Sequence, residues 1–201
     1  MNIGIAQINT IVGDLRGNRE LILESYHHAV NQGADLVVFP ELTVSGYPPM
    51  DLLYKRTFAS DCMKAVESIA AQSSAPLVIG APLLNSSSAG KDLFNAAVVC
   101  AHGEVIGQIA KRLLPTYDVF DESRYFEPGA ETQCLDIGGK TIAITVCEDI
   151  WVDESTATRY KVNPVEELRI HEPDLLLNLS ASPWHVRKTE ARLRYLRNAA
   201  Q

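Results

Sequence analysis

Several features that would point to large classes of function are missing from this sequence. Acidic residues outnumber basic ones, 25 to 18, and the formal net charge is -7. An excess of negative charge argues against nucleic acid or an anionic membrane as a partner. No apolar run approaches the roughly 20 residues that a membrane-spanning helix needs. Met1 leads directly into a strand-like segment, so we expect no signal peptide.

The cysteines also lack a recognisable pattern. Cys62, Cys100, Cys134 and Cys147 are scattered, with no C-x-x-C pair. This spacing argues against a structural zinc site and against a disulfide framework. A reducing, cytoplasmic location is the simplest expectation. The sequence also lacks internal repeats, low-complexity tracts and a convincing linker, so we treat residues 1–201 as one domain.

What is present is the composition and patterning of a globular α/β protein. The chain is 46% hydrophobic and 21% charged. Short apolar runs alternate with segments of helical periodicity, which predicts helices packed outside largely buried sheets. The predicted strands are residues 2–8, 34–39, 76–84 and 174–179. Two hairpins are also predicted, one formed by residues 94–101 and 104–110 and one in which residues 134–137 pair with 141–146 across the Gly138-Gly139 turn. The predicted helices are residues 19–32, capped by Asn18 and stopped by Gly33, and residues 57–72, 164–170 and 186–200.

Three chemically active side chains follow predicted strands directly: Glu41, Lys111 and Cys147. The last of these stands in TIAITVCEDIW, residues 141–151, where a buried strand runs into a thiol and two carboxylates. In α/β folds, reactive groups gather at strand ends. A thiol with an ordinary pKa of ~8.5 needs a base or a cation to become a nucleophile. Glu41 is suited to accept the proton of Cys147, and Lys111 and the backbone N–H of Glu148 are suited to stabilise an oxyanion.

The spacing alone leaves other interpretations open. Cys147 also fits a buried core cysteine, Glu41 a solvated loop carboxylate and Lys111 a surface charge. A Cys–His pair is a further alternative, for which the candidates are His102, His171 and His185. None of these histidines stands in a context that favours it over Glu41.

The flanking residues add a resemblance to a known family. FPEL at residues 39–42, KR at 111–112 and VCED at 146–149 resemble the three signatures of the nitrilase superfamily of carbon–nitrogen hydrolases. Within it, the chain is most similar to the glutaminase domains of glutamine-dependent NAD+ synthetases. The similar stretches are AQINTIVGDLRGN (6–18), PELTVSGYPPMDLL (40–53), KRLLPTYDVFDESRYFEPG (111–129), VCEDIW (146–151) and NLSASPW (178–184).

The resemblance implies a role for each of the three strand-end residues. Glu41 would be the general base, Lys111 the cation that stabilises the oxyanion and Cys147 the nucleophile. Attack on the side-chain amide of glutamine would release ammonia and leave a glutamyl thioester, which water hydrolyses to glutamate. No metal or cofactor is expected in this domain.

The same resemblance places the glutamine-binding residues. They map onto Tyr117, Ser182 and Lys188, and Ser180 is the alternative to Ser182. Lys188 suits the α-carboxylate of the substrate, while Tyr117 and Ser182 suit its polar end. Glu148 would meet the α-ammonium group or position Lys111.

The fold implied by the resemblance is a four-layer α-β-β-α sandwich, truncated at its C-terminus. A sandwich without its last strands would expose a sheet edge and apolar surface. The family's enzymes continue into a synthetase domain that uses ATP and Mg2+ and works in cis. The S-G-G-x-D-S pattern typical of that domain is absent here, so we expect no ATP site in residues 1–201. Relatives associate through outer helices, which predicts a homo-oligomer. A stand-alone amidase and a catalytically silent binding module are the alternative functions.

Overall fold

The computed structural model describes residues 1–55, 57–152, 160–184, 186 and 188–200, and it places the strands in two sheets. The first sheet has five strands in chain order, β1 to β5. The second has three, β6 to β8, also in chain order. The strands are β1 Ile3–Ile5, β2 Leu36–Val38, β3 Leu77–Leu84, β4 Leu93–Ala101, β5 Glu104–Ala110, β6 Cys134–Asp136, β7 Thr141–Val146 and β8 Leu175–Leu179.

Strand direction is mixed in both sheets. β1, β2 and β3 run parallel, and β4 and β5 continue the first sheet antiparallel. In the second sheet β6 is antiparallel to β7, and β8 is parallel to β7. Because β2, β5, β7 and β8 all end near the same place, the residues that follow them are brought together.

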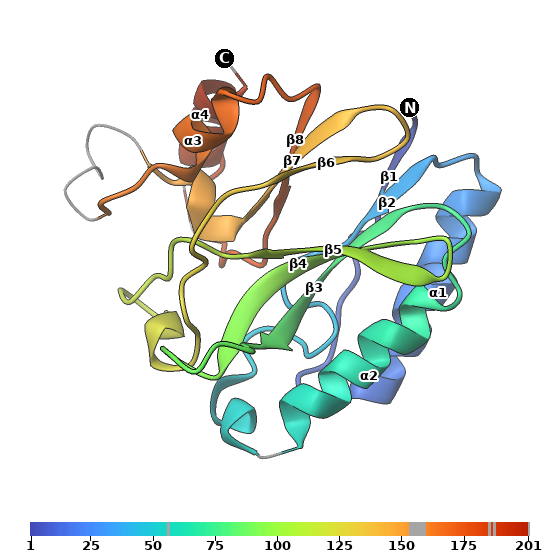
Figure 1. Cartoon of the computed structure of the whole chain (residues 1–201), viewed down its shortest axis with the longest axis horizontal. Helices are drawn as coiled ribbons and strands as arrows, with labels where there is room; N and C mark the ends of the chain where they lie inside the picture. Colours follow the sequence, from blue (N-terminus) through green and yellow to red (C-terminus); the bar gives the residue numbers. More distant parts are fainter. Residues whose placement is uncertain (56, 153–159, 185, 187, 201) are drawn as a thin grey trace.

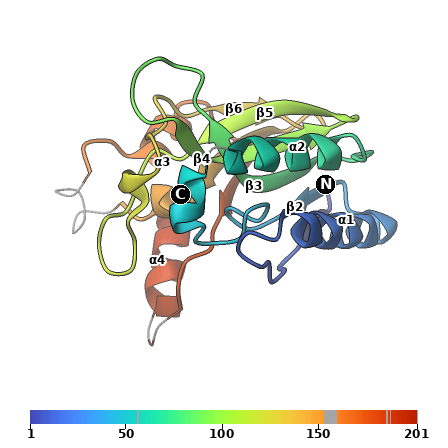
Figure 2. The same cartoon turned by 90° about the horizontal axis from the view of Figure 1, so that it is seen from below.

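Helices cover the outer face of each sheet. Helices α1 (Leu15–Asn31) and α2 (Phe58–Ala70) lie against the five-stranded sheet, and α3 (Pro164–Arg169) and α4 (Lys188–Ala199) lie on the side of the three-stranded sheet (Figure 1). Seen from below, α1 and α2 lie side by side along one flank of the molecule and α4 extends from the other part (Figure 2). The predicted four-layer α-β-β-α sandwich is confirmed.

Two apolar cores hold the layers together. Side chains that alternate in direction along the strands contribute to both cores. In β3, Leu77, Ile79 and Ala81 pack toward α1 and α2, whereas Val78 packs toward the second sheet. Successive side chains of a strand point to opposite faces. Because both faces of β3 are covered, its first seven residues are all buried. On the helix side, α2 buries an apolar face made of Phe58, Cys62, Ala65, Val66 and Ile69.

The start of the first helix differs from the prediction. The helix begins at Leu15 rather than at residue 19, and its N-cap is Asp14, which accepts a hydrogen bond of 2.9 Å from the backbone N–H of Gly17. Asn18 is instead buried inside the helix, where its side chain bonds to the backbone of Ile11 and Val44. Both residues are good caps, and the tertiary contacts of Asn18 decide between them. The predicted stop at Gly33 is confirmed, with φ +86°.

The two predicted hairpins are confirmed, but the predicted ends of several other elements are too long. His102 and Gly103 join β4 to β5 with positive φ at both positions, as a tight hairpin turn requires. Gly138 and Gly139 do the same between β6 and β7. By contrast, β1 covers only three of the seven residues predicted, because the chain leaves the sheet after Ile5.

The last strand of the second sheet has an open edge. In the described part of the chain β8 pairs only with β7. A cavity of about 830 Å³ lies between this edge and α4, and Leu175, Leu176 and Leu196 contribute to its wall. Leu175 and Leu176 are half-buried there, and Leu196 is exposed. None of the described helices is both long enough and apolar enough to cross a membrane.

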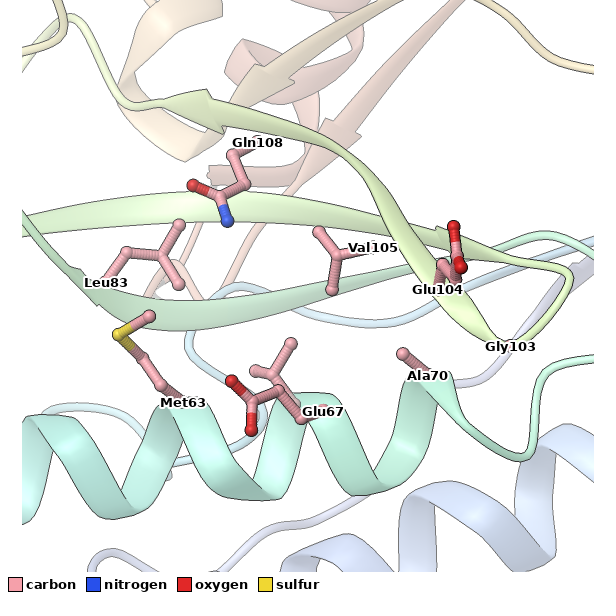
Figure 3. Close-up of a pocket in the computed structure, with 9 residues that line it drawn as sticks. Met63, Glu67, Ala70, Leu83, Gly103, Glu104, Val105 and Gln108 are labelled. Atoms are coloured by element: carbon pink, nitrogen blue, oxygen red, sulfur yellow. The ribbon is translucent and has the colours of Figure 1, made fainter.

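A second, smaller cavity of about 310 Å³ lies between α2 and the part of the β4–β5 hairpin near its turn. Met63 and Glu67 of α2 face Leu83 of β3 and Val105 and Gln108 of β5 across it (Figure 3). The cavity lies on the helix-covered side of the first sheet, among residues that follow none of the strand ends discussed above.

Candidate active site

Cys147 stands at the sharp turn where β7 ends. Its backbone has φ +43°, a left-handed conformation that costs energy for a residue with a side chain. The residue begins a short 3-10 helix, Cys147–Ile150, and its side chain is buried. Leu42, which follows Glu41, has φ +49°. Two of the strand ends therefore hold strained backbone, which is typical of functional sites.

A buried carboxylate fixes this turn to the neighbouring strand end. Asp149 accepts hydrogen bonds from the backbone N–H groups of Val146 (2.9 Å), Arg112 (3.0 Å) and Leu113 (2.8 Å). Burial raises the pKa of Asp149 to about 7, against the opposing effect of these three donors. One side chain thus joins the end of β7 to the residues that follow Lys111.

Lys111 follows β5 and is completely buried between two carboxylates. Its Nζ lies 2.7 Å from Oε1 of Glu41, and 2.9 and 2.8 Å from the two carboxylate oxygens of Glu122. Burial acts to lower the pKa of Lys111, but the nearby acidic groups of Glu41, Cys147 and Glu122 together hold it well above its ordinary value. The ammonium group is therefore a permanent positive charge inside the site.

Glu41 is held from three directions. Besides Lys111, its Oε1 accepts a 2.8 Å hydrogen bond from Nδ2 of Asn95, a residue of β4. Its Oε2 accepts a 3.1 Å bond from the backbone N–H of Ala181, which lies just after β8. Strands from both sheets therefore orient this carboxylate.

Glu122 is a site residue that the sequence analysis did not predict. It lies on a short 3-10 helix, Glu122–Arg124, inside the long loop of residues 115–129. Besides Lys111 it binds the hydroxyl of Tyr47 (3.1 Å) and Nδ2 of Asn95 (3.2 Å). Burial raises the pKa of Glu122, and Lys111 opposes that shift. The length and composition of the loop indicate a function, but nothing local separates Glu122 from the other acids of the loop.

The environment of Cys147 keeps its resting thiol protonated. Burial raises the pKa of Cys147, and the negative charge of Glu41 raises it further. The charge of Lys111 and a hydrogen bond from Ser180 act in the opposite direction. Ser180 Oγ lies 3.5 Å from Sγ of Cys147. A base that takes the proton during the reaction is therefore needed.

The predicted substrate-binding residues fall into two groups. Tyr117 and Glu148 lie together, with the Tyr117 hydroxyl 2.8 and 2.9 Å from the carboxylate oxygens of Glu148. The sequence reasoning missed Tyr160, whose hydroxyl donates to the same carboxylate at 2.6 Å. Lys188 opens α4 and holds its Nζ 5.2 Å from the centre of the Trp151 ring. Burial lowers the pKa of Lys188, while the nearby acidic groups of Cys147 and Glu148 act to raise it.

The two candidate serines have different surroundings. Ser182 is half-buried, and its backbone N–H donates to Oγ of Ser180 at 3.3 Å. Ser180 is the one whose side chain contacts the sulfur.

The alternative Cys–His pair receives no support from the described residues. His102 is exposed in the turn at the start of β5, at the opposite end of that strand from Lys111. His171 is exposed after α3. Cys147 is buried away from both surfaces, so neither imidazole is placed to act as its base. His185 lies outside the described residues.

Comparison with known proteins identifies the family of the chain. The family model described as "Carbon-nitrogen hydrolase" matches residues 2–184. The chain belongs to the carbon–nitrogen hydrolase family. Curated relatives of this hydrolase chain include the glutamine-dependent NAD(+) synthetases of Thermotoga maritima, 39% identical over 98% of the chain, and Aquifex aeolicus, 34% identical over 100%. The chain spans 32% and 34% of their lengths, about one third.

Solved structures extend the similarity to three dimensions. The glutamine-dependent NAD+ synthetase of Acinetobacter baumannii matches 98% of the hydrolase chain with a TM-score of 0.87 and 32% identity, and the match covers 35% of that protein. An amidase of the nitrilase superfamily from Nesterenkonia matches the whole chain with a TM-score of 0.81. Its identity of 23% establishes a common fold.

Proposed function

We propose that this chain hydrolyses the side-chain amide of L-glutamine and supplies ammonia for the ATP-dependent conversion of deamido-NAD+ to NAD+. The observation that carries the proposal is a buried ion pair between Glu41 and Lys111, joined to Cys147 by consecutive residues, Ser180 and Ala181, which contact Cys147 and Glu41 respectively. The names of the relatives supply the substrate, because each is a glutamine-dependent NAD+ synthetase of which this chain matches about one third.

The first half of the reaction forms a thioester. Glu41 accepts the proton of Cys147 as the sulfur attacks the amide carbon of glutamine. The oxyanion that develops is stabilised by Nζ of Lys111 and by the backbone N–H of Glu148, the residue after the nucleophile. Glu41 then returns the proton to the nitrogen, the C–N bond breaks, and neutral ammonia leaves.

The second half regenerates the thiol. Glu41, again a carboxylate, accepts a proton from water as the oxygen attacks the thioester carbon. The C–S bond breaks, glutamate is released, and the proton returns to the sulfur. The acylation proton moves between Cys147 and Glu41, two groups inside one buried cluster, so the net charge of the cluster does not change. This suits a site whose burial makes any change in net charge costly.

The groups around Glu148 suit the two charged ends of an amino acid. Glu148, held by Tyr117 and Tyr160, offers a fixed negative charge for the α-ammonium group. Lys188 offers a positive charge for the α-carboxylate, and Ser182 a polar contact. These assignments make the proposal specific for an α-amino acid amide.

The remaining requirements of NAD+ synthesis are assigned outside residues 1–201. ATP and Mg2+ would bind in a synthetase domain, in cis, that corresponds to the two thirds of the relatives that this chain does not match. Among the described residues no cluster of three or more His, Cys, Asp or Glu is suited to hold a metal ion. We also propose a homo-oligomer, in which outer helices form the contacts.

A stand-alone amidase acting on another small amide is the second candidate. The observation in its favour is that the whole chain matches the fold of the Nesterenkonia amidase with a TM-score of 0.81. The Tyr117–Glu148–Tyr160 cluster favours glutamine, since a simple aliphatic amide has no ammonium group to meet it. Comparing turnover of glutamine with that of propionamide distinguishes the two candidates.

The proposal is tested by Cys147→Ala in the full-length protein, with Cys134→Ala as the control for loss of an ordinary cysteine. We expect Cys147→Ala to abolish release of glutamate from glutamine while ammonia-driven synthesis of NAD+ continues. Retained glutamine hydrolysis would rule out the assignment. Covalent labelling of wild-type Cys147 by a glutamine-mimicking electrophile separates an active site from a silent binding module, which would not react.

A further inference from the structure

The residue that follows β8 contacts the sulfur of the candidate nucleophile. Oγ of Ser180 lies 3.5 Å from Sγ of Cys147, a hydrogen-bonding distance for sulfur. The next residue, Ala181, donates its backbone N–H to Oε2 of Glu41 at 3.1 Å. Two consecutive residues of one loop therefore contact the nucleophile and the proposed base.

The register of the second sheet fixes this contact. β7 and β8 are parallel, and Val146 pairs with Leu179, so the next residues along each strand, Cys147 and Ser180, are neighbours. Asn178 strengthens the pairing, because its Nδ2 binds Oγ1 of Thr145 (3.1 Å) and the carbonyl oxygen of Cys147 (3.3 Å). The pairing of β7 with β8 therefore places Ser180, directly after β8, beside Cys147.

The partners of the Ser180 hydroxyl allow it to donate a hydrogen bond to the sulfur. A serine hydroxyl has one hydrogen to donate and two lone pairs to accept with. The backbone N–H of Ser182 donates to one of these lone pairs at 3.3 Å, which leaves the hydroxyl hydrogen available. The sulfur of Cys147, 3.5 Å away, is the acceptor for that hydrogen.

The sulfur needs such a donor. Burial and the charge of Glu41 both disfavour the thiolate of Cys147, and Lys111 opposes them from within its ion pairs. Lys111 also has the developing oxyanion to stabilise. A neutral donor aimed at the sulfur stabilises the thiolate without adding a second positive charge to the cluster.

We propose that Ser180 is a catalytic residue that donates a hydrogen bond to the sulfur of Cys147 and stabilises its thiolate. Ser180 keeps its own proton throughout, and the proton of Cys147 passes to Glu41. The bond strengthens when the thiolate attacks and again when it leaves the second tetrahedral intermediate. The proposal rests on the hydrolytic function above and separates Ser180 from Ser182, which we assign to glutamine.

The test compares Ser180→Ala with Ser180→Thr and Ser182→Ala in the full-length protein. The first measurement is the rate at which iodoacetamide alkylates Cys147 as a function of pH, without glutamine, followed by mass spectrometry of the Cys147 peptide. For Ser180→Ala we expect the alkylation rate at each pH below the midpoint to fall by about tenfold to a hundredfold, the size expected for a lost hydrogen bond to a charged group. Ser180→Thr, which keeps the hydroxyl, restores the wild-type rate.

The second measurement is glutamine hydrolysis. Ser180→Ala is expected to lower kcat by about tenfold to a hundredfold with KM within about twofold, since the lost bond acts on the nucleophile. Ser182→Ala is expected to raise KM instead and to keep the wild-type alkylation profile. Thermal unfolding of each variant shows that the comparison is between folded proteins.

Two results would overturn the proposal. An alkylation profile of Ser180→Ala that coincides with that of the wild type means that the hydroxyl does not stabilise the thiolate. A rise in KM without a fall in kcat means that Ser180 binds substrate. Failure of the glutamine assignment is recognised separately. If the wild type hydrolyses no glutamine but Ser180 acts on the sulfur, alkylation of Cys147 would still differ between Ser180→Ala and the wild type.

Discussion

At the scale of single residues, the site depends on a lysine that shares two carboxylates. Lys111 is fully buried, and both Glu41 and Glu122 lie within 3 Å of its Nζ. One acidic neighbour neutralises the lysine, and the second gives the cluster a net negative charge while Cys147 is protonated. Burying three charges is costly, so such a cluster is an indication of function rather than of stability.

Replacing Glu122 with glutamine tests this view. Glu122→Gln keeps the shape of the side chain but removes the charge that helps to position Lys111. We expect kcat for glutamine hydrolysis to fall by about tenfold to a hundredfold, since a lost charge-assisted hydrogen bond corresponds to about 1.5–3 kcal/mol. KM is expected to change little, because Glu122 lies behind Lys111 and not against the proposed substrate groups.

The neighbouring residue provides the control. Asp121 has a side chain 52% exposed and pairs only distantly with Arg124, at 4.0 Å. Asp121→Asn is therefore expected to retain wild-type kinetics. Equal activity of Glu122→Gln and the wild type would show that the second carboxylate is not needed.

The site residues that the sequence predicts follow regular strands, whereas those that it does not predict lie in loops. Glu41, Lys111 and Cys147 each follow a strand whose apolar pattern is plain, so their convergence is predictable once the strands are. Glu122 and Tyr160 lie in irregular segments, where no periodicity predicts the direction of a side chain. Their contacts depend on tertiary folding of loops, which the local sequence does not encode.

At the scale of elements, the position of Glu41 depends on close packing between a loop and a strand. Gly80 of β3 lies directly under the segment that carries Glu41. A Cβ at this position would lie 2.6 Å from the carbonyl oxygen of Pro40 and would collide with the backbone nitrogen of Leu42. Backbone atoms cannot move aside as a side chain can, so the glycine is required for this approach.

Gly80→Ala is expected to displace the segment that carries Glu41. The overpacking should lower the free energy of unfolding by about 1–3 kcal/mol. It should also lower kcat by about a hundredfold, because a misplacement of about 1 Å at the reacting groups can have that effect. Urea denaturation and glutamine kinetics measure the two effects.

Gly107 of β5 offers a matched control within the same sheet. A Cβ there would meet only the flexible end of the Leu135 side chain. Gly107→Ala is expected to cost less stability than Gly80→Ala and to retain activity. The explanation fails if the two variants are equally impaired.

The sequence pattern predicts the interiors of helices and strands better than their ends. The interior of α2 and both hairpins are predicted correctly, because apolar periodicity and paired turn residues are strong local signals. The start of α1 is wrong by four residues, since Asp14 and Asn18 are equally good caps and the choice depends on the contacts of Asn18 with the loop containing Val44.

At the scale of the whole molecule, a buried acid makes stability depend on pH. The pKa of Asp149 is raised by burial from 3.8 to about 7 in the folded protein. Between these two values the folded state binds more protons than the unfolded state. The contribution of Asp149 to stability is therefore greatest at low pH and is lost as the pH rises toward 7.

The expected loss is up to a few kcal/mol between about pH 4 and pH 7, at about 1.4 kcal/mol per unit of pKa shift. Urea denaturation of the wild type and of Asp149→Asn across this range isolates the effect, because asparagine does not titrate. As the pH rises, the free energy of unfolding of the wild type should fall relative to that of Asp149→Asn. A difference that is constant with pH would show that the pKa of Asp149 is not raised.

The division of the whole molecule into helix and sheet layers is not predicted by periodicity alone. The alternation of strands and helices indicates an α/β protein with buried sheets. It does not indicate that the strands divide into two sheets after β5. That division was predicted from the family resemblance, and the proposed homo-oligomer rests on the same basis.

The strand order has a consequence for the time course of folding. Within each sheet the strands follow the order of the chain, so each sheet can form from neighbouring segments. Glu41 and Lys111 belong to the first sheet, and Cys147 and Ser180 to the second. The catalytic centre is therefore complete only when the two sheets are in contact. During refolding, the appearance of glutamine hydrolysis would mark that contact and serve as a clock for completion of the sandwich.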